Sequence, residues 1–361
     1  MQKRKRGMIA AICGAVCLAV CLSLSGCQKI GSDVTLIEET SSQTSDTSSE
    51  ASPVQETGAL NPLKGTYDLE EEHAGRRPVA VMINNHHASW PQYSISQADL
   101  IYELPVEGGY TRLMAMYADY TKAPVIGSIR SVRHDFVELA QPFDCIFVHW
   151  GGSDSGYSAL RSSGLDEVDG MAYSNTYFYT DRTLNRSVEH CRFMKAEQLT
   201  QAVSDLKIDL NGDTPSPFRF AEPSSLVLYE DTQAQTAQVP LSGDIQVTYT
   251  YHPDQKKYEK GEYGESTVDG ADGQPVLIDN VFILFAPVSL MQDGVHKDIS
   301  LNQGSGWYLT RGTKTPIQWK KGNASSPMKY TLESGEELTV NPGNSWVLFA
   351  PTSVQERVTF G

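Results

Sequence analysis

Charged side chains surround a Gly-Gly turn in one of the most apolar parts of the sequence. The stretch YELPVEGGYTR, residues 102–112, carries Glu103, Glu107 and Arg112. Charges in an apolar region need partners, because an unpaired ion is costly to remove from water. The stretch RSVRH, which begins eighteen residues after Arg112, extends this candidate polar cluster with Arg130, Arg133 and His134.

Three kinds of chemistry fit these residue types. In the first, the carboxylates pair internally with the arginines and orient the strands against a helix. In the second, spare guanidinium groups bind a carboxylate or a phosphate at the helix end. In the third, Glu103 and Glu107 serve as the acid and base of a hydrolase, as paired carboxylates do in glycosidases. The sequence alone leaves all three interpretations open.

The geometry of the turn decides whether Glu103 reaches Arg112. A plain hairpin would pair Tyr102 with Arg112 and place Glu103 on the opposite face of the sheet. A one-residue bulge at Gly108–Gly109 would instead set Glu103 opposite Arg112, and glycines in a turn permit such a bulge. We therefore expect the two side chains to meet.

A helix that begins near Ser131 would complete the cluster. Helix N-termini carry about half a positive charge and favour anions. Arg130 and Arg133 lie at that end of the predicted helix, so they require a carboxylate or an anionic ligand. We predict that Glu103, Arg112, Arg130 and Arg133 lie in one polar cluster.

Other polar residues are weaker candidates. The segment GGSDSG, residues 151–156, lacks the lysine of a phosphate-binding loop, so we interpret it as a tight turn. Asp154 and Ser155 are predicted to line a cleft near His149, and His190 is a further candidate. His86 and His87 would point opposite ways on a strand, and no other His pair has metal-ligand spacing, so neither a metal nor a cofactor is predicted.

The residues before about 215 alternate predicted strands with predicted helices. Their strands are apolar on both faces, as expected when a sheet is covered on each side. The helix that begins at Ser131 would direct Val132, Phe136, Leu139 and Ala140 to one face. The strands are predicted at 78–84, 98–104, 110–117 and 145–150, and the helices at 131–141, around Tyr157–Leu160 and at 195–207.

The rest of the chain contains predicted strands separated by Gly, Asn and Asp turns, and no predicted helix. The expected fold class is therefore α+β. An N-terminal α/β domain with a covered mixed sheet, residues 62–222, precedes a β-rich C-terminal domain, residues 240–358. The boundary is placed where Pro, Ser and Gln cluster.

The N-terminus has the features of a secretory signal. Four basic residues, 3–6, precede an uncharged apolar run at 8–24, as in the n-region and h-region of such a signal. The run ends at LSGC, which resembles the lipobox of bacterial lipoproteins. That resemblance implies that residues 1–26 are removed and that Cys27 carries a diacylglycerol, whose acyl chains hold the protein at a membrane.

Residues 27–61 are predicted to form a disordered tether rich in Ser, Thr and acidic side chains, because such a composition buries too little apolar surface to fold. Removal of the four basic leader residues would lower the net charge from −15 to −19. This acidity argues against nucleic acid as a partner. Cys145 and Cys191 remain in the folded part, and a bridge between them is left open.

A set of motifs spans nearly the whole folded region. They include RPVAVMINN, SQADLIYELPVEGGYTRLMA, IGSIRSVR, FVHWGGSD, YEKGEYG, IDNVFIL and GWYLTRGTKTPIQWKK. Together they resemble the YerB-like bacterial lipoproteins, a family of unknown function, over roughly residues 62–358. The resemblance implies a two-domain body on a lipid anchor, without a known catalytic residue. The segment SVEHCR, residues 187–192, departs from the family's Pro-His-Asn pattern, and His190 stands in its place.

These observations predict a lipid-anchored protein on the extracytoplasmic face of the cell membrane. We expect a non-enzymatic binding or scaffold role at the cell envelope, with an anionic cell-wall ligand or an envelope protein as partner. The alternative is a cell-wall hydrolase or transferase that uses Glu103 and Glu107.

Overall fold

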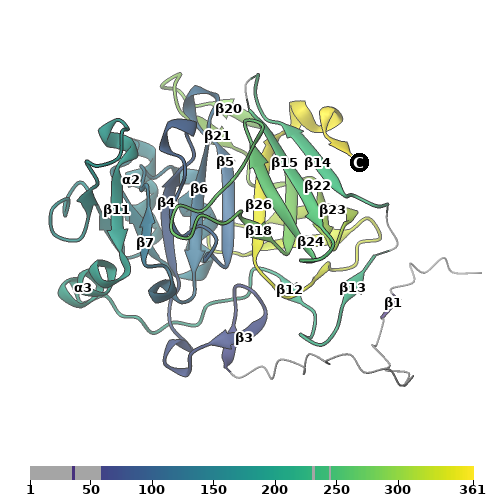
Figure 1. The fold of residues 1–361 in the computed structure, drawn as a ribbon, viewed down its shortest axis with the longest axis horizontal. Helices are drawn as coiled ribbons and strands as arrows, with labels where there is room; N and C mark the ends of the chain where they lie inside the picture. The colour runs from purple at the N-terminus through teal and green to yellow at the C-terminus, as the bar shows by residue number, and fades with distance from the viewer. Residues whose placement is uncertain (1–34, 37–57, 230–231, 244) are drawn as a thin grey trace, which may run out of the picture. The chain divides into compact units, whose positions relative to one another are not determined.

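The computed structural model describes residues 35–36, 58–229, 232–243 and 245–361. A mixed sheet of ten strands lies at the centre of this described part (Figure 1). In spatial order the strands are β24 (Met328–Leu332), β23 (Thr313–Lys321), β22 (Gln303–Thr310), β19 (Asn280–Ala286), β26 (Ser345–Pro351), β5 (Leu100–Pro105), β6 (Thr111–Tyr117), β4 (Val79–Asn84), β8 (Ile146–His149) and β9 (Glu167–Asp169).

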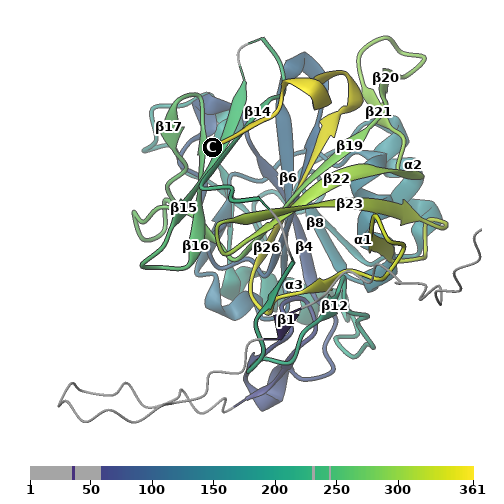
Figure 2. The same cartoon turned by 90° about the vertical axis from the view of Figure 1, so that its right-hand side faces the viewer.

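Strands from both ends of the sequence meet in the middle of this sheet. β26 lies between β19 and β5 and runs parallel to both, with Val347 opposite Phe282 on one side and Tyr102 on the other. Figure 2 shows how strongly the sheet twists from β6 to β23. The predicted N-terminal and C-terminal regions are therefore joined by backbone hydrogen bonds.

Alternation along the central strands sends side chains into two separate cores. In β4, Val79, Val81 and Ile83 belong to one core, and Ala80 and Met82 to the other. Both sets are buried because each face of the sheet is covered, and this explains why the strand has no polar face. Two short helices, α1 (His134–Ala140) and α2 (Asp154–Ser163), cover the face of Ala80 and Met82.

The opposite face is covered by α3 (Ala196–Leu206) and by a second sheet. That sheet contains β17 (Glu265–Ser266), β16 (Lys257–Glu262), β15 (Gln246–His252), β14 (Thr236–Pro240) and β27 (Thr359–Phe360), with β18 (Leu277–Ile278) also paired to β16. A three-stranded sheet contains β10 (Tyr179–Thr180), β11 (Arg192–Lys195) and β7 (Val125–Gly127).

Short elements complete the described part. The two-stranded pairs are β1 (Thr35–Leu36) with β13 (Val227–Leu228), β2 (Ala59–Asn61) with β3 (Thr66–Leu69), β12 (Arg219–Phe220) with β25 (Thr339–Val340), and β20 (Val288–Leu290) with β21 (Lys297–Ile299). The 3-10 turns are η1 (Glu71–His73), η2 (His87–Ser89), η3 (Glu107–Gly109), η4 (Tyr120–Lys122), η5 (Gln141–Phe143), η6 (Val188–His190) and η7 (Thr352–Arg357).

The predicted α+β class is confirmed, but the helix near Ser131 starts later than predicted. Ser131 is not its N-cap, because α1 begins at His134 with Arg133 as the N-cap. Val132 instead forms a β-bridge with Gly152, and the Ser131 hydroxyl donates to the Trp150 carbonyl at 3.1 Å. Tertiary pairing thus keeps the backbone extended there.

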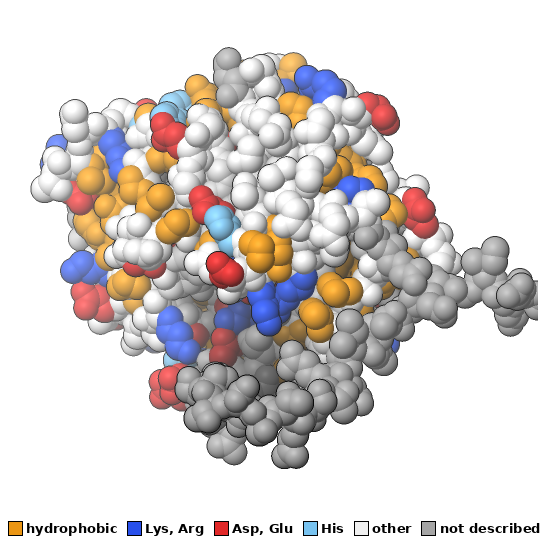
Figure 3. All heavy atoms as spheres, turned by 45° about the vertical axis from the view of Figure 1, so that its right-hand side comes forward, with side chains coloured by type: hydrophobic (Ala, Val, Ile, Leu, Met, Phe, Trp, Pro, Cys, Tyr) orange, Lys and Arg blue, Asp and Glu red, His pale blue; other side chains and the backbone are white. Residues whose placement is uncertain are grey.

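The predicted signal peptide and Cys27 lie outside the described residues. Inside the predicted tether, 27–61, the structure has β1 and β2, which were not predicted. Cys145 and Cys191 are both buried free thiols. None of the helices described here is long and apolar enough to cross a membrane. Figure 3 shows acidic, basic and hydrophobic side chains scattered over one face, without a continuous basic surface.

Candidate functional site

Three central strands end at the same edge of the large sheet, and polar residues gather there. β4 and β8 are parallel, and β5 has the same direction because β6 runs antiparallel to both β4 and β5. In open α/β sheets, ligands bind outside the carboxyl ends of the strands. A binding site is therefore expected at this edge.

One carboxylate at this edge is shared by two buried arginines. Arg112, at the start of β6, donates from Nη2 to Glu107 Oε1 at 3.2 Å and from Nη1 to the Ser131 carbonyl at 2.8 Å. Arg133 donates from Nε to Glu107 Oε2 at 3.1 Å and also from Nη2 to Oε1. Gly108 supplies the left-handed backbone, with φ of 72°, that turns the chain beside Glu107.

Electrostatics at this edge is dominated by positive charge. Burial raises the pKa of Glu107, but Arg112 and Arg133 outweigh burial and lower it to about 2. Burial and the charge of Arg133 lower the pKa of Arg112 to about 9. Glu107 is therefore an anion at neutral pH, yet a single carboxylate faces two guanidinium groups.

Two further arginines at this edge make no hydrogen bond or ion pair through their side chains with any described residue. Arg130 is half-buried, and its Nε atom has no partner. Arg192 Nε also has no partner, and its guanidinium lies 4.2 Å from the ring centroid of Trp150. Backbone hydrogen bonds from Ile129 to Arg192 at 2.7 Å and from Trp150 to Arg130 at 3.0 Å hold the three segments around Arg130, Trp150 and Arg192 together.

We call Arg112, Arg130, Arg133 and Arg192 the arginine cluster. After the larger effect of burial, the charge of Arg130 lowers the pKa of Arg112 and of Arg192. The charge of Arg133 in turn lowers the pKa of Arg130. Glu107 is the one described carboxylate that forms an ion pair with the cluster. The cluster therefore has the excess of donors and positive charge that an anion-binding site needs.

Aromatic side chains lie next to the arginine cluster. The His86 ring is 4.3 Å from Tyr110 and stacks on His190 at 5.1 Å between centroids. Asn84 Nδ2 lies 2.8 Å from His190 Nδ1. Burial lowers the pKa of His86 and of His190, and the charge of Arg130 lowers both further. The two imidazoles are thus held in their neutral form.

Glu103 lies on the other face of the sheet, contrary to the prediction. Leu104, not Glu103, is opposite Arg112, and Glu103 is opposite Leu113. Successive strand residues point to opposite faces, so Glu103 points toward the second sheet. There it is fully buried and accepts a hydrogen bond from Trp346 Nε1 at 2.8 Å. The turn carries no bulge that changes the alternation, and the predicted contact with Arg112 is wrong.

His134 is also separate from the arginine cluster. Its Nε2 atom lies 3.0 Å from Asp298 in β21 and 3.3 Å from Asp135, so it connects α1 to the β20–β21 hairpin. Burial raises the pKa of Asp135 to about 7, although the charge of His134 opposes this. These three side chains bring their ligand atoms within 4.8 Å of one another.

The secondary candidates do not form one cleft. Asp154 and Ser155 line a hollow of about 550 Å3 between the start of α2 and the β20–β21 hairpin. His149 is not part of its lining, because it is fully buried and contacts the Gly151 carbonyl at 2.8 Å and Glu167 at 2.9 Å. The predicted cleft near His149 is therefore wrong.

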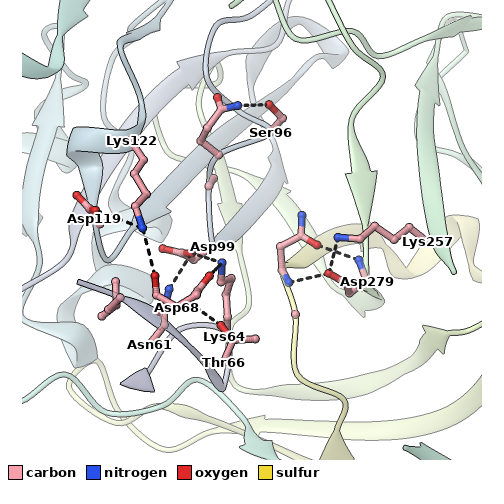
Figure 4. Close-up of a pocket in the computed structure, with 15 residues that line it drawn as sticks. Asn61, Lys64, Thr66, Asp68, Ser96, Asp99, Asp119, Lys122, Lys257 and Asp279 are labelled. Atoms are coloured by element: carbon pink, nitrogen blue, oxygen red, sulfur yellow. Dashed lines mark hydrogen bonds and ion pairs between the residues drawn. The ribbon is translucent and has the colours of Figure 1, made fainter. Parts of the chain in front are cut away.

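A second hollow, of about 400 Å3, lies at the other end of β5, beside Asp99 (Figure 4). Lys64 pairs with Asp68 and lies 3.4 Å from Asp99 on one side, while Lys257 pairs with Asp279 at 2.9 Å on the other. Its acids and bases are internally paired, so it lacks the spare donors of the arginine cluster.

Sequence reasoning missed Arg192, His86 and Trp150 as members of this edge. The signal was available for two of them, because His86 follows β4 and Trp150 follows β8 at the ends of predicted strands. Arg192 comes from β11 in a separate small sheet, and nothing local in the sequence places it beside the others.

Comparison with known proteins gives one consistent family. Residues 63–209 match the N-terminal domain, and residues 237–347 the C-terminal domain, of a protein of unknown function (DUF3048). The chain is 29% identical over 291 residues to "Putative lipoprotein YerB" of Bacillus subtilis (strain 168), covering 80% of this chain and 86% of that protein.

A solved structure agrees with this match. The crystal structure of the YerB protein from Bacillus subtilis superposes with a TM-score of 0.74 at 26% identity, and the match covers 84% of this chain and 99% of that one. Both matched domains contribute strands to one continuous sheet in the present structure. On this evidence the chain belongs to the DUF3048 family, to which the resemblance to YerB-like lipoproteins had pointed.

Proposed function

We propose that this protein is a lipid-anchored binding protein on the extracytoplasmic face of the cell membrane, and that its arginine cluster binds an anionic ligand. The observation that carries the proposal is the pair of guanidinium groups, Arg130 and Arg192, at the carboxyl edge of β4 and β8, which form no hydrogen bond or ion pair with another described residue. The lipoprotein name of the Bacillus subtilis relative supports the membrane location.

The chemistry of the arginine cluster favours an anion with paired oxygens. Guanidinium groups present parallel N–H donors that match a carboxylate or a phosphate. Half-buried charges without a partner are unfavourable, so a ligand anion would compensate Arg130 and Arg192. Glu189 attracts Arg130 electrostatically but forms no ion pair with it, and the Glu189 carboxylate is hydrogen-bonded to Ser187.

Exposed apolar side chains at this edge indicate that the ligand is more than a bare ion. Tyr110 contacts His86, Val188 lies in η6 beside His190, and both are exposed. Met171, 64% exposed, lies beside Gly151 at the end of β8. An anionic group carried by a cell-wall polymer or by an acidic segment of an envelope protein fits such a surface.

The geometry gives no support to a hydrolase based on Glu103 and Glu107. Glu103 is fully buried on the face covered by the second sheet. Glu107 is held as a carboxylate by Arg112 and Arg133 on the other side. The two groups do not face a common substrate position, so they cannot act as an acid/base pair.

Calorimetric titration tests the proposal. The full-length protein in detergent is titrated with inorganic phosphate, a polyol-phosphate oligomer and a muramyl peptide, which separates phosphate from carboxylate sources. We expect Arg130→Gln and Arg192→Gln each to weaken binding at least about tenfold, a loss of about 1.4 kcal/mol.

The matched control is Arg161→Gln, because Arg161 is exposed on α2. It should bind like the wild type. Equal affinity in all three variants, or no binding of any of these anions by the wild type, would overturn the proposal.

A further inference from the structure

A lysine and two glutamates are buried together where the large sheet faces the second sheet. Lys260 in β16, Glu262 and Glu103 each have 0% exposure. Lys260 Nζ lies 2.7 Å from Glu262 Oε2 and 3.6 Å from Glu103 Oε2. The ring of Trp346, 5.1 Å from Nζ to the centroid, lies beside this group. Ionisable groups so deeply buried are rare unless they are paired.

An asparagine amide shares the same carboxylate. Asn85, just after β4 and 1% exposed, donates from Nδ2 to Glu262 Oε2 at 2.9 Å and to Glu103 Oε1 at 3.2 Å. Its carbonyl oxygen accepts a hydrogen bond from Gln92 Nε2 at 2.6 Å. The Lys260 amine and the Asn85 amide nitrogen therefore lie within two hydrogen-bond lengths of each other, joined by one carboxylate oxygen.

We propose that Lys260 and Asn85 form an intramolecular amide bond and that Glu262 promotes the reaction. This inference concerns a different site from the arginine cluster and does not depend on it. Each group has the chemistry that the reaction needs: a nucleophilic amine, an amide carbonyl polarised by Gln92 and a carboxylate in contact with both nitrogens.

The reaction balances without an added reagent. Glu262 takes a proton from the Lys260 ammonium, and the free amine attacks Asn85 Cγ. A bond forms between Nζ and Cγ, and the bond between Cγ and Nδ2 breaks. The departing nitrogen takes protons from the former ammonium by way of Glu262. One lysine ammonium and one asparagine amide become one secondary amide and one ammonium ion.

The surroundings favour this proton transfer. Glu103 accepts hydrogen bonds from the Thr111 hydroxyl at 2.7 Å and from Trp346 Nε1. Glu262 Oε1, in contrast, has no hydrogen-bond partner within the described part of the chain. Burial raises the pKa of Glu103. Burial alone would lower the pKa of Lys260, but Glu103 and Glu262 outweigh it and raise the pKa. The ammonium is thus the resting form, and the amine arises by transfer to Glu262 in a space that excludes water.

The bond would connect the two matched family domains covalently. Asn85 follows β4 in the large sheet, and Lys260 lies in β16 of the second sheet. A cross-link between positions so distant in sequence restricts the unfolded chain strongly. Such a link suits a body exposed outside the cell, where proteases and mechanical stress act on it.

Tryptic mapping of the full-length wild-type protein, purified from membranes and then denatured, tests the proposal. Trypsin cleaves after arginine and after lysine, but only where the lysine side chain is free. We expect peptide 77–112, which begins after Arg76 because trypsin does not cleave before Pro78, to be found joined to the peptide that contains Lys260. The pair should be lighter than its two parts by the mass of one ammonia. Cleavage after Lys257 should proceed as an internal control, whereas cleavage after Lys260 should be absent. Linear peptides that end at Lys260 in full yield would overturn the proposal.

Two variants test the role of Glu262. Glu262→Gln keeps a similar volume and should abolish the joined peptide, whereas Glu259→Gln, on the same strand and paired with His252, should leave it unchanged. A joined peptide that persists in Glu262→Gln would overturn the assignment of Glu262. If Glu262→Gln does not fold, the wild-type map still decides whether the bond exists.

Discussion

Glu107 is the residue that allows two arginines to be buried side by side. Its side chain is 28% exposed and contacts both Arg112 and Arg133. Breaking a buried charge pair is costly because the remaining charge is left without a partner. The carboxylate is therefore needed for stability, while the spare donors of Arg130 and Arg192 remain available to a ligand.

The low pKa of Glu107 predicts a specific dependence of stability on pH. The folded-state pKa, about 2, lies below the ordinary value of 4.5. The stabilisation is therefore fully present above pH 4.5 and is lost as the pH falls toward 2. Between pH 6 and pH 3 the wild type should lose about 2 kcal/mol more unfolding free energy than Glu107→Gln.

Urea unfolding at the two pH values measures this difference. Glu70→Gln is the matched control, because Glu70 is exposed, and it should follow the wild type. An equal loss in the wild type and in Glu107→Gln would show that the ion pairs contribute nothing.

Of the six residues in the candidate polar cluster, four were correctly predicted from the sequence to lie close together. Glu107, Arg112, Arg130 and Arg133 stood out because charges are rare in such apolar surroundings. Glu103 could not be placed, because a single residue of register moves a strand side chain to the other face. Its true neighbours, Lys260 and Trp346, come from segments far away in the sequence.

At the scale of elements, the apolar runs predicted the central strands well because both faces of the sheet are covered. The pairing of β26 with β5 could not be predicted, because no local sequence pattern indicates which distant strand will pair with a given strand. Segment 129–132 was predicted partly as helix, and bridges from Ile129 to Ile83 and from Val132 to Gly152 keep it extended instead.

The position of β26 predicts that the N-terminal domain is not independent. A fragment of residues 62–222 would leave β5 without its partner and expose an apolar edge strand, which invites aggregation. We expect this fragment to elute as aggregates in size-exclusion chromatography, whereas residues 58–361 should be monodisperse and unfold in one transition. A monomeric, cooperatively unfolding fragment would contradict the structural role of β26.

For the whole molecule, the predicted anchor is tested by fractionation. Cys27→Ala should release the body from the membrane fraction or retain the leader, because the lipid would be missing. Cys21→Ala, within the same apolar run, should stay at the membrane as the wild type does. A Cys27→Ala protein that is processed and still sediments with membranes would refute the anchor.

The net negative charge of the whole chain explains why anion binding would need the arginine cluster. A chain with a net charge of −15 repels anions over most of its surface, so anion binding requires a local concentration of donors. The arginine cluster supplies such a concentration at one edge of the sheet. The lipid anchor predicted from the sequence would hold this edge at the envelope, where anionic polymers and proteins are abundant.

Anion binding by the arginine cluster is tested most directly by a crystal structure of the protein with tungstate, whose anomalous scattering locates the anion. We expect a peak within hydrogen-bond distance of the guanidinium groups of Arg130 and Arg192 in the wild type, and its loss in Arg130→Gln. A wild-type crystal in which Arg130 and Arg192 are paired with protein carboxylates, or in which tungstate avoids the arginine cluster, would contradict it.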